Sequence, residues 1–215
     1  MHVFKWRPST VPSRLNGTFF LHRGHVPSRC GSAVAVLSIT ALAHAADADL
    51  RKAAVGRWKS EAAEDLGNGS FGTRDFTFTA TKWQLTFTIY ADKELKTPLV
   101  AMDFEGPWAP GKASEKVSGA TEATFDFTGK KVTLKAKDVA KNFGMDGCGL
   151  EVGKAKDVSK SGCSFVASVE KYGREFDLFK VDGAAMWLGA RPADGNMGAE
   201  DKRPTALGAK LVKAK

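Results

Sequence analysis

Apolar and polar residues alternate along the body of this chain, and this pattern constrains its fold more than any other feature. Within 75–79, Phe76 and Phe78 fall on one face of an extended segment, and the polar residues between them fall on the other. The segment 82–90 repeats the pattern, and weaker or shorter versions follow at 100–104, 125–127, 132–134, 175–181 and 185–190. Alternation of this kind predicts half-buried antiparallel strands, apolar inside and polar outside.

Turn signals connect these segments into a simple order. The short link Thr81-Lys82 predicts a hairpin between 73–80 and 82–91, and Thr128-Gly129-Lys130 predicts another turn. One short helix is predicted at 135–144, and the Gly- and Pro-rich tail from Pro192 to Lys215 is expected to wrap the outside or fray. The sequence therefore predicts one all-β domain over 46–215, an antiparallel meander forming a barrel or half-barrel, lipocalin-like in outline.

The segment before this body differs from it in composition. Residues 33–42 form an apolar run that basic residues precede, and Ala43-His44-Ala45 follows it with the small residues that a signal peptidase recognises. The run is shorter than the roughly 20 apolar residues that a membrane span needs. We interpret 1–45 as a signal peptide cut after Ala45, which predicts a periplasmic or secreted protein. An uncleaved membrane anchor is the alternative.

Charge and histidine content narrow the possible functions. The first 45 residues hold five basic residues, no acidic ones and all four histidines, so the body has a net charge of only +3. A mildly basic body does not indicate nucleic-acid binding. A body without histidine excludes Ser-His-Asp catalysis and His-based zinc sites, and it has no Gly-rich phosphate loop. We therefore expect a non-enzymatic protein without cofactor or metal, with lysine-based catalysis as the enzymatic alternative.

Two cysteines remain in the body, Cys148 and Cys163. An even count in an exported chain predicts one disulfide, which in the chain-entropy model contributes about 3 kcal/mol for a loop of roughly 15 residues. A dithiol metal or redox site is the alternative. The lysines at 130, 131, 135, 137 and 141 are expected to form a solvated face that contacts anionic lipid head groups at most peripherally.

A series of short motifs runs in order along the body: GRWKSE (56–61), TRDFTF (73–78), IYAD (89–92), GATEATF (119–125), KDVA (137–140), GCG (147–149), SGC (161–163), FKVDG (179–183), GARPADG (189–195) and KRPTALG (202–208). In this order they resemble the adenomatosis polyposis coli down-regulated 1 family, whose animal members inhibit Wnt signalling. The resemblance runs from about residue 53 to 212, and the chain looks like a bacterial single-domain member. It implies a β-barrel-like or half-barrel fold with an apolar cavity for a lipid chain, without a Wnt partner. Cys148 and Cys163 match the cysteines of the family.

The candidate cavity residues are the aromatic side chains expected to point inward: Trp58, Phe76, Phe78, Trp83, Phe87, Phe104, Phe125, Phe127 and Trp187. Ligand pockets are mostly apolar, yet each of these residues taken alone is more often ordinary core. Arg74, Glu122 and Arg191 are the candidate polar residues at the cavity or barrel end. Arg74 or Arg191 could contact a lipid head group. We favour the structural alternative, in which Glu122 pairs with one of these arginines or with Arg203.

These observations predict an exported, non-enzymatic protein that holds a hydrophobic ligand, a fatty acyl chain or lipid, in an aromatic-lined barrel. The alternative is an envelope protein-interaction or structural module whose barrel is filled by its own side chains. The first function would draw its affinity from burial, at roughly 0.8 kcal/mol for each enclosed CH₂ group. The two readings differ in whether the barrel interior has room for a ligand.

Overall fold

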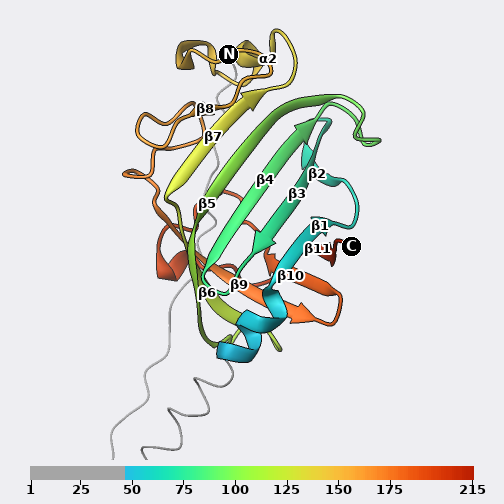
Figure 1. The fold of residues 1–215 in the computed structure, drawn as a ribbon, viewed down its shortest axis with the longest axis vertical. Coiled ribbons are helices and arrows are strands. Elements are labelled where there is room, and N and C mark those ends of the chain that lie inside the picture. Colours follow the sequence, from blue (N-terminus) through green and yellow to red (C-terminus); the bar gives the residue numbers. More distant parts are fainter. Residues whose placement is uncertain (1–46) are drawn as a thin grey trace, which may run out of the picture. The chain divides into compact units, whose positions relative to one another are not determined.

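The computed structural model describes residues 47–215, so the predicted signal peptide lies outside the described residues (Figure 1). Its strands are β1 (Gly56–Ser60), β2 (Glu64–Gly67), β3 (Ser70–Phe78), β4 (Lys82–Tyr90), β5 (Pro98–Ala113), β6 (Thr121–Asp126), β7 (Gly129–Leu134), β8 (Lys156–Asp157), β9 (Arg174–Asp182), β10 (Ala185–Gly189) and β11 (Leu207–Lys213). Helical structure is confined to residues 47–54, α2 (Val139–Asn142) and the 3-10 turns η1 (Asp146–Cys148) and η2 (Glu200–Lys202). None of these described helices has the length and apolar character that crossing a bilayer requires.

Eight of these strands form a closed antiparallel barrel in the order β3-β1-β11-β10-β9-β6-β5-β4. The ring closes because β4 pairs with β3 on one side and with β5 on the other. The predicted hairpin is confirmed as β3–β4, in register from Phe71↔Tyr90 to Phe78↔Trp83. Closure pairs both edges of every barrel strand, which removes the exposed edges of an open sheet.

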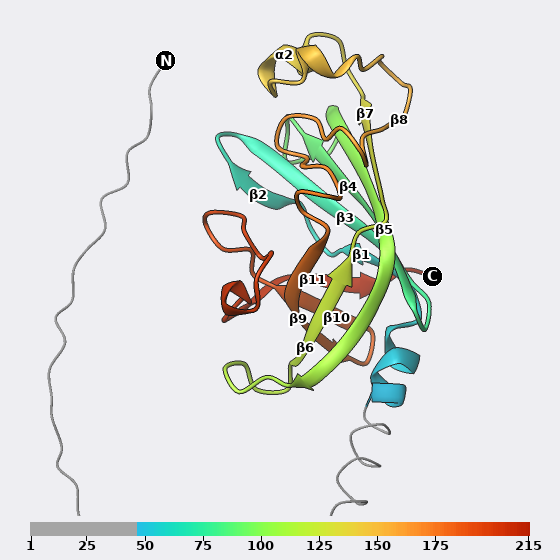
Figure 2. The ribbon, with the colours of Figure 1, turned by 90° about the vertical axis from the view of Figure 1, so that its left-hand side faces the viewer.

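The long strand β5 divides the barrel into two parts. One edge of β5 pairs with β4 along most of its length, while the other edge pairs first with β7 and then, from Trp108 to Ala113, with β6. At the change of partner, a Cβ on Gly106 would lie 1.9 Å from the carbonyl oxygen of Asp126, so only glycine fits there. Beyond this point the sheet β2-β3-β4-β5-β7-β8 continues as a curved, open half, as Figure 2 shows.

Each half has its own hydrophobic cluster. The closed half is filled mainly by aromatic residues of the barrel strands, and Leu50 and Ala54 of the 47–54 helix pack against them. The open half is covered by the cap, residues 135–173, which carries α2, η1 and β8. Buried residues of the cap pack on the open sheet beside Val100 and Val132: Val139, Met145, Val158, Cys163 and Val166. The predicted helix at 135–144 is confirmed but shorter, as α2.

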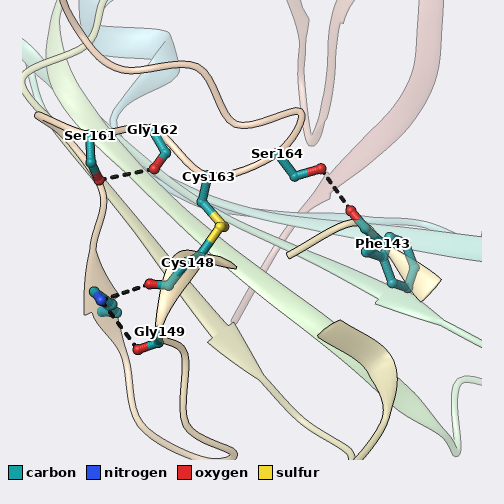
Figure 3. The surroundings of a disulfide bond; sticks show 8 residues. Phe143, Cys148, Gly149, Ser161, Gly162, Cys163 and Ser164 are labelled. Carbon is teal, nitrogen blue, oxygen red and sulfur yellow. Dashed lines mark hydrogen bonds between the residues drawn. A yellow bond between two sulfur atoms is a disulfide. The ribbon is translucent and has the colours of Figure 1, made fainter. Parts of the chain in front are cut away.

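The predicted disulfide is confirmed within the cap, between Cys148 and Cys163 (Figure 3). Lys156 Nζ donates to the carbonyl oxygens of Cys148 and Gly149 at 2.7 and 3.2 Å, and Ser164 Oγ donates to the carbonyl oxygen of Phe143 at 2.7 Å. These contacts and the disulfide join three irregular stretches of the cap to one another. A segment with so little regular structure of its own is thereby held on the sheet.

The C-terminal tail corrects one expectation. It was predicted to wrap the outside or fray, but its last part is β11, which pairs with β1 and with β10 and so completes the barrel. Leu211 is buried in the aromatic cluster and anchors this strand. The pairing of a C-terminal strand with β1 joins residues about as far apart in sequence as this body allows, and local composition carries no signal for it.

Candidate functional site

Six of the nine candidate cavity residues form a packed aromatic cluster in the closed half. They are Trp58, Phe76, Phe78, Trp83, Phe125 and Phe127, and they are joined by Trp108 and Phe179. Neighbouring rings lie 5.2 to 6.3 Å apart between centroids, mostly in edge-to-face or tilted arrangements. The indole nitrogens are satisfied by backbone carbonyls, for example Trp58 Nε1 by Ala54 at 2.7 Å and Trp83 Nε1 by Asp126 at 3.1 Å. These side chains themselves occupy the interior of the closed half.

Two further candidates, Phe87 and Phe104, lie where the closed half meets the open half. Both are only partly buried, as is Leu85. Phe104 packs edge-on against Phe127 with 5.8 Å between ring centroids, and the guanidinium of Arg74 lies 5.8 Å above the ring of Phe87. We call Leu85, Phe87 and Phe104 the apolar rim. Unlike the aromatic cluster, the apolar rim keeps part of its surface accessible.

The ninth candidate, Trp187, corrects the expectation that it points inward. Its neighbour Met186 is fully buried in the aromatic cluster, so Trp187 lies on the opposite, outer face of β10. There it pairs across the sheet with Lys180, whose Nζ lies 5.8 Å from the centre of the indole ring. In the sequence AMWLGA both Met186 and Trp187 are apolar, and alternation alone could not choose between the two faces.

A polar pocket of about 390 Å³ lies at the mouth of the barrel, beside the apolar rim. Its walls come from the β1–β2 connection, β3, the end of β10 and the start of β11: Glu61, Ala62, Ala63, Glu64, Asp65, Arg74, Gly189, Ala190, Arg191, Gly208, Ala209 and Lys210. Small residues around the irregular β10–β11 pairing leave this space open. The mouth pocket, as we call it, brings together Arg74 and Arg191, which the sequence separates by more than half of the body.

Both arginines of the mouth pocket hold carboxylates that are nearly buried. Arg74 Nη1 lies 2.8 Å from Glu64, whose side chain is 10% exposed. Arg191 donates to both carboxylate oxygens of Glu175 at 2.8 and 3.1 Å, and Glu175 is equally buried. The guanidiniums themselves stay more open, with 24% of the Arg74 and 48% of the Arg191 side chain exposed. The mouth pocket therefore contains two partly exposed guanidinium groups, and each is held in position by a more deeply buried carboxylate.

Glu122 lies elsewhere. Its carboxylate is 3.7 Å from the guanidinium of Arg203, and Arg203 Nη1 also donates to the carbonyl oxygen of Ala123 at 2.8 Å. On β6 Glu122 alternates with Ala123 and Phe125, which face the core, so it points outward. The structural interpretation of Glu122, as a partner of one of the arginines, is confirmed, and Glu122 does not line the mouth pocket.

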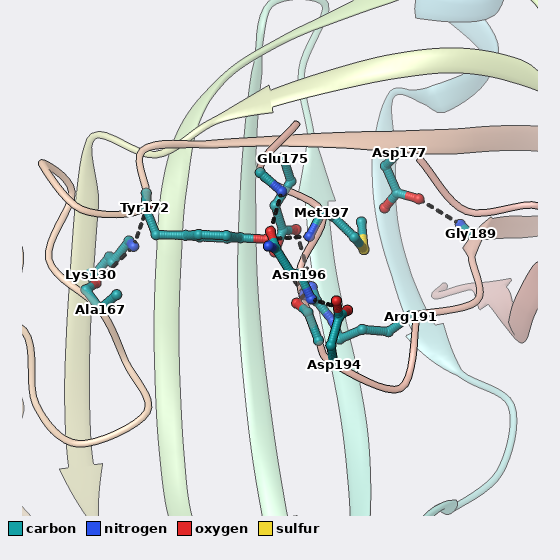
Figure 4. A network of polar contacts seen from close by, with 12 residues as sticks. Lys130, Ala167, Tyr172, Glu175, Asp177, Gly189, Arg191, Asp194, Asn196 and Met197 are labelled. Atoms are coloured by element: carbon teal, nitrogen blue, oxygen red, sulfur yellow. Dashed lines mark hydrogen bonds and ion pairs between the residues drawn. The ribbon is translucent and has the colours of Figure 1, made fainter. Parts of the chain in front are cut away.

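A network of buried polar residues lies behind the mouth pocket (Figure 4). The Asp177 carboxylate, 4% exposed, accepts hydrogen bonds from the backbone amides of Leu178 and Gly189 at 2.7 and 2.8 Å. Burial, reinforced by the negative charge of Glu175, raises the pKa of Asp177 to about 7. The hydroxyl of Tyr172 accepts a hydrogen bond from the amide of Met197 at 2.8 Å, and burial raises the pKa of this hydroxyl.

Lys130 belongs to the same network and is the one residue of the five-lysine face for which the expectation of a solvated side chain is wrong, because the other four are exposed. It is 3% exposed, and its Nζ donates to the carbonyl oxygens of Ala167 and Tyr172 at 2.8 and 2.6 Å. The same ammonium lies 4.6 Å from the ring centre of Phe127, and burial lowers its pKa. Lys130 thus fastens the cap to the barrel, whereas its neighbour Lys131 is exposed.

Sequence reasoning also missed Glu175 and Asp177, although a signal was present. In EFDLFKV the two carboxylates occupy positions of one face together with Phe179, the face that points into the barrel. Charged residues at core-facing positions of a strand are unusual unless they are paired or buried for a reason. Within residues 47–215, no group of three or more His, Cys, Asp or Glu side chains is arranged to hold a metal ion.

Comparison with known families gives one match. The family model described as adenomatosis polyposis coli down-regulated 1 matches residues 31–165, which include β1 to β8 and both cysteines of the disulfide. The matching residues end before β9, so the resemblance of the motifs at 179–183, 189–195 and 202–208 stays a prediction. A comparison with curated proteins found no match. The match covers more than half of the sequence and follows the motif series found in it, and the chain belongs to the adenomatosis polyposis coli down-regulated 1 family.

Proposed function

We propose that this protein is an exported, non-enzymatic binding protein that holds a hydrophobic ligand, a fatty acyl chain or lipid, at the mouth of its barrel. The observation that carries the proposal is the position of Arg74, which lines the mouth pocket and lies 5.8 Å from the ring of Phe87 in the partly exposed apolar rim. Its volume of about 390 Å³ falls within the usual range of ligand sites, roughly 300–1,000 Å³. A site of this kind buries an apolar chain on one side and leaves a polar end at the arginines.

The apolar rim supplies the surface on which a chain would lie. Phe87 rests against the backbone of β3, where a Cβ on Gly72 would approach its ring to 2.8 Å, and Leu66 packs beside it with 39% of its surface exposed. Each CH₂ group removed from water contributes roughly 0.8 kcal/mol, so a chain of about ten methylenes gains about 8 kcal/mol before the entropic cost of binding. An acyl chain can therefore bind here without many specific contacts.

The filled closed half limits where the ligand can lie. A chain reaching into the aromatic cluster would have to separate rings that already contact one another, such as Trp83 and Phe125 at 5.4 Å between centroids. Protein interiors packed in this way resist insertion of extra volume. The proposal therefore assigns the ligand to the mouth pocket and apolar rim, and the aromatic cluster serves as their support.

Export and lack of catalysis are parts of the same proposal. The disulfide between Cys148 and Cys163 is typical of oxidising compartments, and so supports a periplasmic or secreted protein. The charged groups around the mouth pocket are held in ion pairs, as with Arg74 and Glu64 or Lys210 and Glu61. Groups tied in this way are suited to holding a ligand in place. The Ser60 hydroxyl donates to Glu64 at 2.8 Å, but Arg74 pairs with the same carboxylate and its backbone amide donates to the Ser60 oxygen, so we assign this serine a structural role.

A filled barrel also favours a second candidate, an envelope protein-interaction or structural module. The aromatic cluster supports this second candidate, because a core without free space is stable without a bound ligand. The two candidates differ in what accompanies the protein when it is purified. Only the binding protein would carry an acyl species.

The test is mass spectrometry of solvent extracts from natively purified protein, together with titration of a fluorescent fatty acid. We expect a near-stoichiometric acyl species, and we expect Phe87→Glu to abolish binding. Tyr90→Glu is the matched control, because Tyr90 lies on the same strand but on its outer face, opposite Phe71. Empty protein that also ignores the fluorescent fatty acid would reject the binding function and favour the structural module. Binding that survives Phe87→Glu in folded protein would reject the apolar rim as the site.

A further inference from the structure

The mouth pocket carries balanced charge. Its lining includes three cationic side chains, Arg74, Arg191 and Lys210, and three carboxylates, Glu61, Glu64 and Asp65. Glu175 adds a further carboxylate behind Arg191. A purely anionic group would meet the field of these carboxylates at close range, and a purely cationic group would meet the arginines. An uncharged group would gain no electrostatic attraction from either the carboxylates or the arginines.

The arginines of the mouth pocket have N–H groups beyond those that bind Glu64 and Glu175, and these can donate hydrogen bonds to a ligand. A guanidinium has five N–H donors in a planar fork, and in residues 47–215 only Nη1 of Arg74 contacts Glu64. Arg191 uses Nη1 and Nη2 for Glu175, and Nη1 also for the carbonyl oxygen of Gly195 at 3.0 Å. Because Glu64 and Glu175 fix these arginines from behind, their remaining N–H groups are presented in set positions. Such donors suit a phosphate or carboxylate oxygen.

The anionic side lies on the β1–β2 connection and the start of β2. Glu61 is paired with Lys210 at 2.7 Å, and its side chain is 51% exposed. Asp65 is exposed and pairs across the sheet with Phe71, so it lines the pocket from the outer face, opposite to the face of Arg74. One of its carboxylate oxygens accepts a hydrogen bond from the amide of Gly67 at 2.8 Å. An ionised carboxylate has about four acceptor positions, so both groups keep capacity for an ammonium.

We propose that the mouth pocket selects a zwitterionic head group, with a phosphate held by Arg74 and Arg191 and an ammonium held by Glu61 and Asp65. The inference rests on the proposed function, because the chain attached to this head group would lie on the apolar rim. It names the ligand class as a single-chain phosphate–ammonium amphiphile. Fatty acids and uncharged acylglycerols are then weaker ligands of the same site.

The experiment compares three ligands with one acyl chain by isothermal titration of the purified protein below their critical micelle concentrations. They are a lysophosphatidylethanolamine, the free fatty acid and the monoacylglycerol. We expect the zwitterionic ligand to bind at least tenfold more tightly than either of the others. Equal or tighter binding of the fatty acid or monoacylglycerol overturns the inference and leaves the proposed function standing. If none of the three binds, the proposed function fails, and the inference fails with it.

A pair of double variants identifies the groups responsible. Replacing Arg191→Gln together with Glu175→Gln removes the cation without leaving a buried carboxylate alone. We expect this variant to lower the preference for the zwitterion over the monoacylglycerol from at least tenfold to about threefold or less. The matched control is Arg174→Gln with Asp126→Asn, which removes a bidentate pair on the outer face and should keep the preference.

Arg74→Gln with Glu64→Gln provides a second route if the first double variant does not fold. It removes the other arginine of the mouth pocket and its partner together. A preference that persists in a folded variant of either pair would overturn the assignment of the phosphate to these arginines.

Discussion

Replacing Asp177 with asparagine should stabilise the protein at neutral and alkaline pH. Asp177 lies inside the barrel, where one carboxylate oxygen accepts hydrogen bonds from the amides of Leu178 and Gly189. The amide oxygen of asparagine can accept the same two bonds in nearly the same position. The substitution therefore keeps the geometry and removes only the charge that burial and Glu175 disfavour.

The magnitude follows from the pKa. A rise from the ordinary 3.8 to about 7 in the folded state, at 1.36 kcal/mol for each pKa unit, corresponds to about 4 kcal/mol. Because the folded pKa is raised, the protonated carboxyl favours folding: its contribution is fully present below pH 3.8 and is lost as the pH rises through about 7. Asp177→Asn should thus exceed the wild type in free energy of unfolding by up to about 4 kcal/mol at pH 8, and the difference should approach its minimum near pH 4.

The assay is urea unfolding followed by tryptophan fluorescence at pH 4, 6 and 8, for wild type and variant. The control is Asp157→Asn, an exposed aspartate whose pKa is lowered by a hydrogen bond from the amide of Ser159. Asp157→Asn should be slightly less stable than the wild type. This loss is already present at about pH 4, stays nearly constant up to pH 8 and disappears only as the pH falls below about 4. A difference between wild type and Asp177→Asn that stays constant from pH 4 to pH 8 would refute the reasoning.

Three further variants test how the cap is held and how the barrel closes. Lys130→Ala removes the donor of the Ala167 and Tyr172 carbonyls and should lower the free energy of unfolding by about 1–3 kcal/mol, whereas Lys131→Ala should change it by less than about 0.5 kcal/mol in the same urea assay. Gly106→Ala brings a methyl group within 1.9 Å of the Asp126 carbonyl and should prevent assembly of the barrel, seen as loss of near-ultraviolet circular dichroism; Gly147→Ala, with no atom within 4 Å, should retain the spectrum. Replacing Cys148 and Cys163 together with serine should reduce stability by about 3 kcal/mol and make thermal unfolding insensitive to reductant; a melting temperature equal to that of the oxidised wild type would contradict the role given to the disulfide.

Neighbouring residues alone determined much of the fold. The alternation around Phe76 and Phe78 is a local property of an extended chain, because side chains two residues apart share a face. The hairpin of β3 and β4 follows from two such segments joined by a short link. The pairing of Cys148 with Cys163 needed only the cysteine count and the expectation of export, and the family needed only the order of the motifs.

The candidate cavity residues were chosen because they are aromatic, but the sequence could not tell which of them lie in the core, at the rim or on the outer face. All nine are aromatic and share that feature equally, yet six form the packed cluster, Phe87 and Phe104 are only partly buried beside it, and Trp187 lies outside. Whether an inward aromatic is core or rim depends on what stands opposite it across the barrel. That neighbour comes from a strand distant in sequence.

The tertiary structure alone decided where charge is buried and where the barrel closes. Lys130 is adjacent to an exposed lysine and cannot be distinguished from it by composition, but β7 turns it under the cap, where the carbonyls of residues 167 and 172 satisfy it. β11 becomes a barrel strand because β1 and β10 each offer it an unpaired edge. Local pattern sets the conformation of a segment through contacts within a few residues, whereas its burial and its partners are set by contacts between distant segments, and these exist only once the chain has folded.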